Sequence, residues 1–217
     1  MTQATPKLIK ALFERFEESR PDPKTELHFN TPFTLVVAVA LSAQTTDVAV
    51  NKATEPLFKL ASNPLDMLAL GEDRLREMIS SIGLYRNKAK NVMDMCRILI
   101  THYGGEVPLT REGLLSLPGV GNKTASVVLN ELDIEPAIAV DTHVFRVSHR
   151  LGLVDASDTT PDKVEVQLMK IIPKKWLTRA HHWLILHGRY VCVARKPKCG
   201  TCIVSDLCPK FGVAPKP

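Results

Sequence analysis

Residues 117–125 read LPGVGNKTA, and this stretch indicates how the chain around it folds. Gly119 and Gly121 are separated by one residue, which permits a tight turn whose main-chain N–H groups point outward. Apolar residues recur at helical spacing on both sides of the turn, at residues 114–117 and at residues 125–129. The pattern therefore predicts two short helices that pack across a glycine turn.

Such a turn has a second property. The N–H groups at the start of the second predicted helix have no partner within that helix, and N–H groups of this kind bind phosphate. A helix-hairpin-helix can hold a nucleic-acid backbone in this way without reading its sequence. A lone Gly-x-Gly is common, so a plain turn between two helices is the alternative that these residues leave open.

Four cysteines near the end of the chain have the spacing C-x6-C-x2-C-x5-C. They are Cys192, Cys199, Cys202 and Cys208. Thiolates this close in sequence can converge on one metal centre, either an iron-sulfur cluster or zinc. Zinc sites usually group their ligands as two close pairs, and only Cys199 and Cys202 form such a pair, so the spacing favours a [4Fe-4S] cluster. Two disulfides are a further alternative, but five cysteines and the lack of a secretory leader argue against them.

The composition is that of a globular protein with a packed core. The chain has 217 residues, of which 45% are hydrophobic, and this suffices for one large domain or two small ones. The net charge of +5 is a mild basic excess that favours polyanions as partners. No apolar run reaches the length of a membrane span, so we expect no membrane contact and a cytoplasmic location.

Helix-capping signals recur along the chain. Four capping side chains each precede a proline, which is favoured at the first position of a helix. They are Thr5, Thr31, Asn63 and Thr160. Gly83, Gly104 and Gly152 lie where C-terminal caps are expected. Because alternating strand patterns are nearly absent, the sequence predicts an all-α protein of about ten short helices.

Taken together, three motifs resemble endonuclease III. They are residues 117–125, the run Val140–His143 and the four-cysteine tail, and the likeness extends to residues 41–44 and 82–85. That family is a bifunctional DNA glycosylase and abasic-site lyase of the helix-hairpin-helix superfamily with a [4Fe-4S] cluster. The resemblance implies a six-helix barrel domain at residues 22–132, with the helix-hairpin-helix at about 112–132. A second helical domain, residues 1–21 plus 133–217, would carry the cluster loop 192–208.

The resemblance also implies catalytic roles. Lys123 matches the nucleophile of the family, and burial in a cleft at the positive end of a helix would favour its neutral, reactive amine. Asp141 matches the catalytic carboxylate, which could stabilise a positively charged sugar or help to deprotonate the lysine. Asp141 also looks like the N-cap of the helix that follows it, and the two roles are compatible.

Further residues would contact DNA. Gln44 and Leu84 match positions that fill the space left by an extruded base. His143 and Arg146 could reach phosphate or brace the cluster, and Asn122 departs from the arginine that the family often has there. The full set of predicted DNA-binding residues is Gln44, Leu84, Gly119, Gly121, Asn122, Thr124, His143 and Arg146.

These observations predict a base excision repair enzyme. We expect it to remove oxidised pyrimidines from duplex DNA through a lysine Schiff base and to nick the strand 3′ to the abasic site by β-elimination. Its partner would be duplex DNA with damaged bases or abasic sites, and it would act as a monomer associated with a bacterial nucleoid. The alternatives are a non-catalytic DNA-binding module with a zinc-held tail and an adenine-specific glycosylase of the same superfamily.

Overall fold

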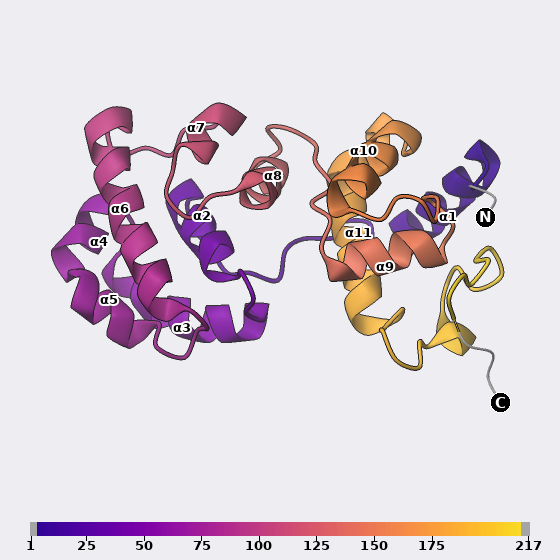
Figure 1. Cartoon of the computed structure of the whole chain (residues 1–217), viewed down its shortest axis with the longest axis horizontal. Helices are drawn as coiled ribbons and strands as arrows, with labels where there is room; N and C mark the ends of the chain where they lie inside the picture. Colours follow the sequence, from indigo (N-terminus) through magenta and orange to yellow (C-terminus); the bar gives the residue numbers. More distant parts are fainter. Residues whose placement is uncertain (1–3, 214–217) are drawn as a thin grey trace. The chain divides into compact units, whose positions relative to one another are not determined.

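The computed structural model describes residues 4–213 and is helical throughout (Figure 1). Within that range it has no strand, which confirms the predicted all-α class. No helix in the same range is both long and apolar enough to cross a membrane. The elements are α1 (Pro6–Ser19), α2 (Pro32–Leu41), α3 (Asp47–Leu60), α4 (Pro64–Leu70), α5 (Glu72–Met78), α6 (Tyr85–Tyr103), α7 (Arg111–Leu115), α8 (Asn122–Glu131), α9 (Thr142–Arg150), α10 (Pro161–Ile171), η1 (Lys174–Trp176), α11 (Leu177–Tyr190) and η2 (Cys199–Thr201).

The predicted helix starts are confirmed at all four proline-marked caps. In each case the side chain before the proline accepts a hydrogen bond from the backbone N–H three residues later. Gly104 ends α6 with a φ of 62°, and Gly152 follows α9 with a φ of 70°. The prediction for Gly83 is wrong, because the left-handed residue there is Leu84, which is the N-cap of α6.

The chain divides into two compact units. One is the continuous segment Thr25–Glu135, and the other combines Met1–Lys24 with Pro136–Pro217. The boundaries predicted from the sequence lie three residues earlier, between residues 21 and 22 and between residues 132 and 133. The outermost residues predicted for the second domain, 1–3 and 214–217, lie outside the described part of the chain.

The unit Thr25–Glu135 is built around α2. This helix is apolar on all sides, and its residues 35–38 have no exposed surface. A helix of that kind must be surrounded, and α2 packs against α3, α6 and α8. The longest helix, α6, also covers α4 and α5. The seven helices α2–α8 thus share one hydrophobic core.

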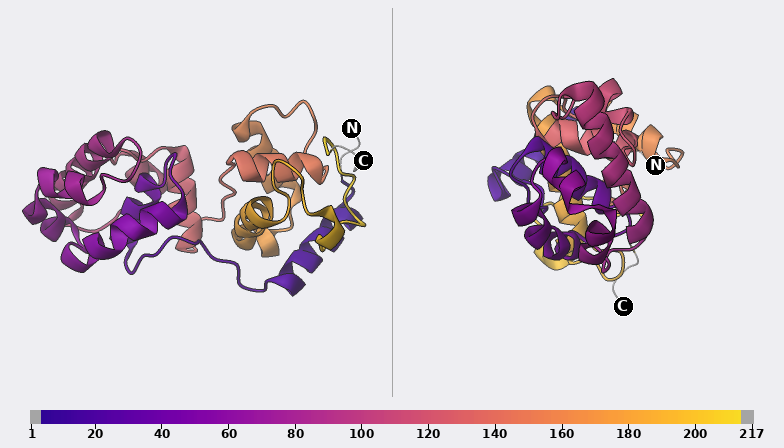
Figure 2. Two further views of the ribbon diagram at one scale, coloured as in Figure 1. Left: turned by 90° about the horizontal axis from the view of Figure 1, so that it is seen from below. Right: turned by 90° about the vertical axis from the view of Figure 1, so that its left-hand side faces the viewer.

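The other unit joins the two ends of the chain. Phe13 of α1 is fully buried, and its ring stacks on that of Trp176 with centroids 5.8 Å apart. The indole N–H of Trp176 donates to Glu17 at 3.0 Å, and that of Trp183 donates to the carbonyl of Arg20 at 2.8 Å. Both tryptophans therefore fix α1 in this unit, and Figure 2 shows α1 beside the C-terminal segment.

Helices α9 and α11 cross closely in the same unit. A Cβ atom on Gly188 would lie 2.8 Å from the Cβ of His143, which is closer than real side chains allow. Only glycine at position 188 permits this approach. The close crossing places the start of α9 beside the last turn of α11, which leads directly into the cysteine loop.

Candidate functional site

The hairpin between α7 and α8 has the geometry that its glycines predicted. Gly119 has a φ of 81°, and a Cβ atom there would lie 3.1 Å from the Cβ of Asn91. Gly121 differs, since its φ is −101° and no atom lies within 4 Å of a Cβ built on it. Inside the turn, the N–H of Val120 donates to the carbonyl of Leu117 at 3.1 Å. Gly119 is therefore required by the turn itself, whereas Gly121 is not.

The start of α8 offers free N–H donors. Gly121 is its N-cap and supplies no capping side chain. In α8, the first backbone N–H that makes a hydrogen bond within the helix is that of Ala125, which donates to the carbonyl of Gly121 at 2.9 Å. The N–H groups of residues 122–124 precede it and have no place in the helical ladder. N–H groups in this position are of the kind that binds an anion such as phosphate.

Lys123 is the second residue of α8. Its side chain is exposed, as are Gly121 and Asn122, while Thr124 is half-buried. The unit Thr25–Glu135, which contains Lys123, thus does not bury this side chain, although the sequence predicted its burial. The lysine does stand at the positive end of the helix dipole, as expected, because α8 begins at Asn122.

Asp141 belongs to the other unit and is the N-cap of α9, which confirms that part of the prediction. Its Oδ1 accepts hydrogen bonds from the backbone N–H groups of His143 and Val144, both at 2.8 Å. Its Oδ2 lies 3.0 Å from Nδ1 of His143. The side chain is only 15% exposed. Two amides and an imidazole therefore fix the carboxylate in one orientation.

Gln44 and Leu84 lie together in the unit Thr25–Glu135. Both are exposed, and both have left-handed backbones, with φ values of 56° and 59°. A Cβ atom built on Gly83 would lie 3.9 Å from the carbonyl oxygen of Gln44, so the two loops are neighbours. A left-handed backbone costs a non-glycine residue roughly 1–3 kcal/mol and is found mostly at functional sites. The structure brings together two residues that are 40 positions apart in the sequence.

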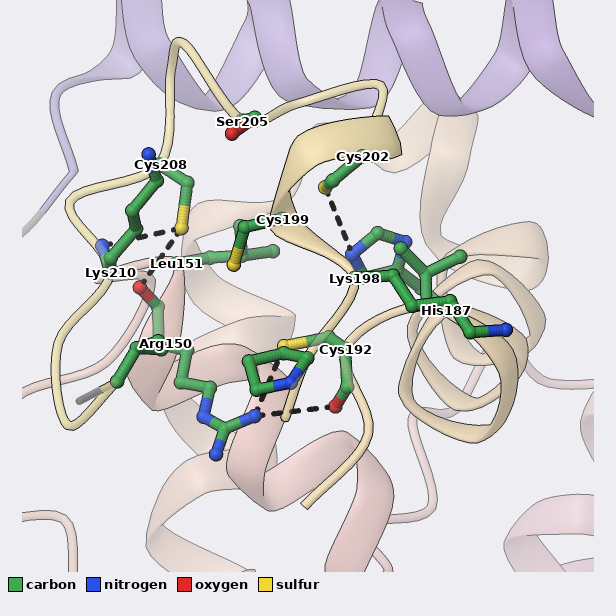
Figure 3. A pocket seen from close by; sticks show the side chains of 13 residues that line it. Arg150, Leu151, His187, Cys192, Lys198, Cys199, Cys202, Ser205, Cys208 and Lys210 are labelled. Atoms are coloured by element: carbon green, nitrogen blue, oxygen red, sulfur yellow. Dashed lines mark hydrogen bonds between the residues drawn. The ribbon is translucent and has the colours of Figure 1, made fainter. Parts of the chain in front are cut away.

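The four cysteines of the C-terminal loop surround one cavity, shown in Figure 3. The cavity is partly open to solvent. No three histidine, cysteine or acidic side chains in residues 4–213 are arranged to hold a single metal ion. Four soft thiolate ligands around one cavity suit a cluster, whose several iron atoms each take one thiolate. The donor set therefore fits a [4Fe-4S] cluster.

Two arginines of α9 fasten the start of this loop. Arg146 donates to the carbonyls of Gly188 at 2.8 Å and Cys192 at 3.1 Å. It therefore braces the start of the loop, which agrees with one of its two predicted roles. Arg150 is 9% exposed and donates to the carbonyls of Val193 at 2.8 Å and Ala194 at 3.0 Å. Its Nη1 also lies 3.5 Å from the Cys192 sulfur. Arg150 is absent from the residues predicted from the sequence, although its spacing of four residues from Arg146 places both on one helix face.

Burial shifts the pKa values of three groups at the cavity in the direction that favours their neutral forms. Burial lowers the pKa of His187 to about 4, and its Nε2 lies 3.6 Å from the Cys202 sulfur. Burial also raises the pKa of the Cys202 and Cys208 thiols. A cysteine binds a metal as its thiolate, so binding of a cluster displaces the protons of these two thiols. His187 is thus a direct neighbour of a predicted ligand.

Known proteins resemble this chain in sequence and structure. Residues 37–174 match the model of the HhH-GPD superfamily of base excision DNA repair proteins, and residues 192–208 match the iron-sulfur binding domain of endonuclease III. Endonuclease III of Rickettsia conorii is 53% identical over 201 residues, which are 93% of this chain and 95% of the relative. Endonuclease III of Escherichia coli K12 is 51% identical over 197 residues, covering 91% and 92%.

A solved structure agrees with these relatives. The trapped covalent intermediate of an endonuclease III with DNA has a TM-score of 0.88 and 46% identity, covering 96% of this chain and 97% of that one. A thermostable thymine-DNA glycosylase has a TM-score of 0.82 and 25% identity, covering 96% and 99%. The match of the cysteine loop confirms the predicted [4Fe-4S] cluster as the cofactor.

Proposed function

This chain belongs to the endonuclease III family of HhH-GPD base excision repair proteins, and from that premise we propose that it removes oxidised pyrimidines from duplex DNA and nicks the strand at the abasic site. It is a DNA glycosylase and lyase, and neither a zinc-held binding module nor an adenine-specific glycosylase is favoured. One observation carries the proposal. A chain that matches endonuclease III over 93% of its length keeps a lysine at the start of α8 and a carboxylate at the N-cap of α9.

Lys123 is proposed as the nucleophile. Its amine attacks C1′ of the damaged nucleotide, and the glycosidic bond breaks as the base leaves with the bonding electrons and a proton. The sugar ring opens to a Schiff base between Nζ and C1′, which acidifies the C2′ hydrogens. Loss of one of them expels the 3′ phosphate and nicks the strand, and water then releases the lysine. The exposed position of Lys123 leaves its amine accessible to an extruded nucleotide.

Asp141 is proposed as the carboxylate that stabilises positive charge on the sugar. An anion held rigidly near a developing oxocarbenium ion lowers the energy of the transition state more than a mobile one does. The two 2.8 Å hydrogen bonds to Oδ1 and the contact of Oδ2 with His143 supply this rigidity. His143 is therefore proposed chiefly to orient Asp141, and its contact with DNA stays a prediction.

Duplex DNA is the proposed partner. The N–H groups after Gly121, with Asn122 and Thr124 beside them, would bind backbone phosphate through the hairpin. Gln44 and Leu84 would fill the space that an extruded nucleotide leaves. A contact of Arg146 with phosphate is proposed only as a secondary role, because its guanidinium already donates to three backbone carbonyls. We also propose that the protein acts as a monomer in the bacterial nucleoid.

The cluster is proposed to have a structural role. Cys192, Cys199, Cys202 and Cys208 would be its ligands, each supplying one thiolate. Bound there, the cluster would supply a rigid centre around which the loop folds. Base removal and β-elimination transfer no net electrons, so neither proposed step requires electrons from it. The basic residues Arg195, Lys196 and Lys198 lie on the loop that it orders.

The decisive experiment replaces the nucleophile. Lys123→Ala should lose nicking of an abasic duplex, and cyanoborohydride should no longer trap a covalent adduct, while most of the affinity for duplex DNA remains. Lys90→Ala is the matched control, since Lys90 is an exposed lysine of α6 that pairs with Asp94 at 2.9 Å. If the wild-type protein consumes the oligonucleotide without a trappable adduct, Lys123 is not the nucleophile. If the wild-type protein does not nick at all, the proposed function is wrong.

The lesion class needs its own measurement. Duplexes with thymine glycol, dihydrouracil, 8-oxoguanine opposite cytosine or a bare abasic site should be compared at equal enzyme concentration. We expect the two oxidised or reduced pyrimidines and the abasic site to be cleaved. Preferential cleavage of the 8-oxoguanine duplex would contradict the proposed substrate.

A further inference from the structure

Lys88 of α6 is a buried cation that has no part in the proposed chemistry. It is 8% exposed, and the residues after it on the same face, Ala89, Val92 and Cys96, belong to the hydrophobic core. Its Nζ donates to the carbonyls of Leu41 at 2.9 Å and Ala43 at 2.6 Å, and to Oγ1 of Thr45 at 3.1 Å. A lysine is buried in this way only when its charge is satisfied.

The three partners match the three donors of an ammonium group. Leu41 is the last residue of α2, where a helix dipole favours a positive charge. Burial lowers the pKa of Lys88, but an ammonium is the form that supplies one hydrogen to each acceptor. Lys88 therefore ties the end of α2 to the loop that follows it.

That loop carries Gln44. Two of the three acceptors come from Ala43 and Thr45, the residues directly before and after it. The backbone N–H of Lys88 donates to the carbonyl of Leu84 at 3.1 Å. The side chain of Lys88 thus holds the carbonyl of Ala43 and the hydroxyl of Thr45, on the two sides of Gln44, while its main chain makes the first helical hydrogen bond to Leu84.

Both of the residues held in this way have strained backbones. Gln44 and Leu84 have φ values of 56° and 59°, and Leu84 gives α6 no side-chain cap. Such conformations persist only where the surrounding structure enforces them. The ammonium of Lys88 supplies that enforcement for the loop of Gln44, and the loop of Leu84 lies directly beside it.

We propose that Lys88 is a positioning residue that holds Gln44 and Leu84 side by side, ready to fill the space left by an extruded nucleotide. The proposal rests on the proposed function, because that function gives Gln44 and Leu84 their roles. Lys88 touches neither the DNA nor the reacting atoms. Its effect should therefore appear only where an orphaned base and an open stack have to be filled.

The test compares two abasic substrates. In the first, the abasic site faces a base in an intact duplex, and in the second it faces a one-nucleotide gap, so there is no orphaned base. Lys88→Met should slow cleavage of the intact duplex roughly 10- to 100-fold, since the loop that carries Gln44 loses the ammonium that holds it beside Leu84. Cleavage of the gapped duplex should change far less. Lys59→Met is the control, because Lys59 is an exposed lysine of α3 that pairs with Glu55.

A fluorescent base supplies a second readout. The probe is 2-aminopurine placed opposite a tetrahydrofuran abasic analogue. The wild-type protein should change its fluorescence as Gln44 displaces the orphaned base. Lys88→Met should abolish that change while it keeps the visible absorbance of the cluster. Thr45→Val removes one acceptor of the three and should show a smaller defect in the same direction, which keeps the test valid if Lys88→Met does not fold.

The outcomes separate the two proposals. Equal losses on the intact and gapped duplexes, or no loss on either, would overturn the role of Lys88. A wild-type protein that forms no cyanoborohydride-trapped adduct on either substrate would instead overturn the proposed function. A defect confined to the intact duplex, together with the lost fluorescence change, supports the role of Lys88.

Discussion

Replacing Asp141 by Asn should separate its structural role from its chemical one. Asparagine caps helices as well as aspartate does, so the two 2.8 Å bonds from the amides of His143 and Val144 can persist. We expect the free energy of unfolding to change by less than about 0.5 kcal/mol. The negative charge is lost, however, and turnover should fall by roughly 10²- to 10⁴-fold.

Asp141→Ala removes the cap as well as the charge. Both amides at the start of α9 lose their acceptor, and His143 loses its partner, so we expect a further loss of about 1–2 kcal/mol of stability. Turnover should fall as far as in Asp141→Asn. The two variants should therefore lose the same amount of activity but different amounts of stability.

Urea titration followed by tryptophan fluorescence measures the stability of the unit that contains Asp141. The chain has two tryptophans, Trp176 and Trp183, and both lie in the unit that contains Asp141. Thr160→Ala is a control in the same unit, because it removes the cap of α10, and it should lose stability without losing turnover. If Asp141→Asn keeps its turnover, or if Asp141→Ala is as stable as Asp141→Asn, then Asp141 does not combine a capping role with a chemical one.

Two further substitutions test the hairpin and the cluster loop. Gly119→Ala should lower the free energy of unfolding of its unit in urea by about 1–2 kcal/mol, because the φ of Gly119 is 81° and Asn91 is only 3.1 Å from the new methyl. Gly121→Ala should change this free energy by less than about 0.5 kcal/mol. Equal costs would show that the left-handed turn is not what selects glycine. Arg150→Met should speed the loss of the cluster to a chelator by about tenfold, as measured by visible absorbance, since two carbonyls of the loop lose a charged donor. Arg195→Met, on the exposed part of the loop, should not change that rate. Identical rates for the two variants would contradict the bracing role.

The features that the sequence predicted well are local ones. An N-cap and its proline act within one turn of helix, so Thr5 and Thr160 mark helix starts without knowledge of the rest of the fold. The glycine turn is equally local. The cysteine spacing is local too, and the cluster that it favoured over zinc agrees with the match of residues 192–208 to the iron-sulfur binding domain of endonuclease III.

The features that the sequence did not predict depend on long-range contacts. Glycine tolerates a left-handed backbone best, so local propensity favours Gly83 for that conformation, but Leu84 adopts it instead, beside the loop that carries Gln44. The acceptors of Arg150 lie more than forty residues away, so its spacing from Arg146 places it on the same helix face but does not show what that face contacts. Lys88 did leave a signal, because it is a lysine on the apolar face of α6.

The division of one unit between both ends of the chain has a consequence during biosynthesis. Phe13 is translated 163 residues before Trp176, the ring on which it stacks. At about 5–20 residues per second, Phe13 is synthesised roughly 8 to 30 s before Trp176, and the aromatic face of α1 has no partner in that interval. The inserted segment Thr25–Glu135 can complete its own core in that interval. Nascent chains should therefore be most prone to capture by chaperones at their first helix, until the last third of the message has been read.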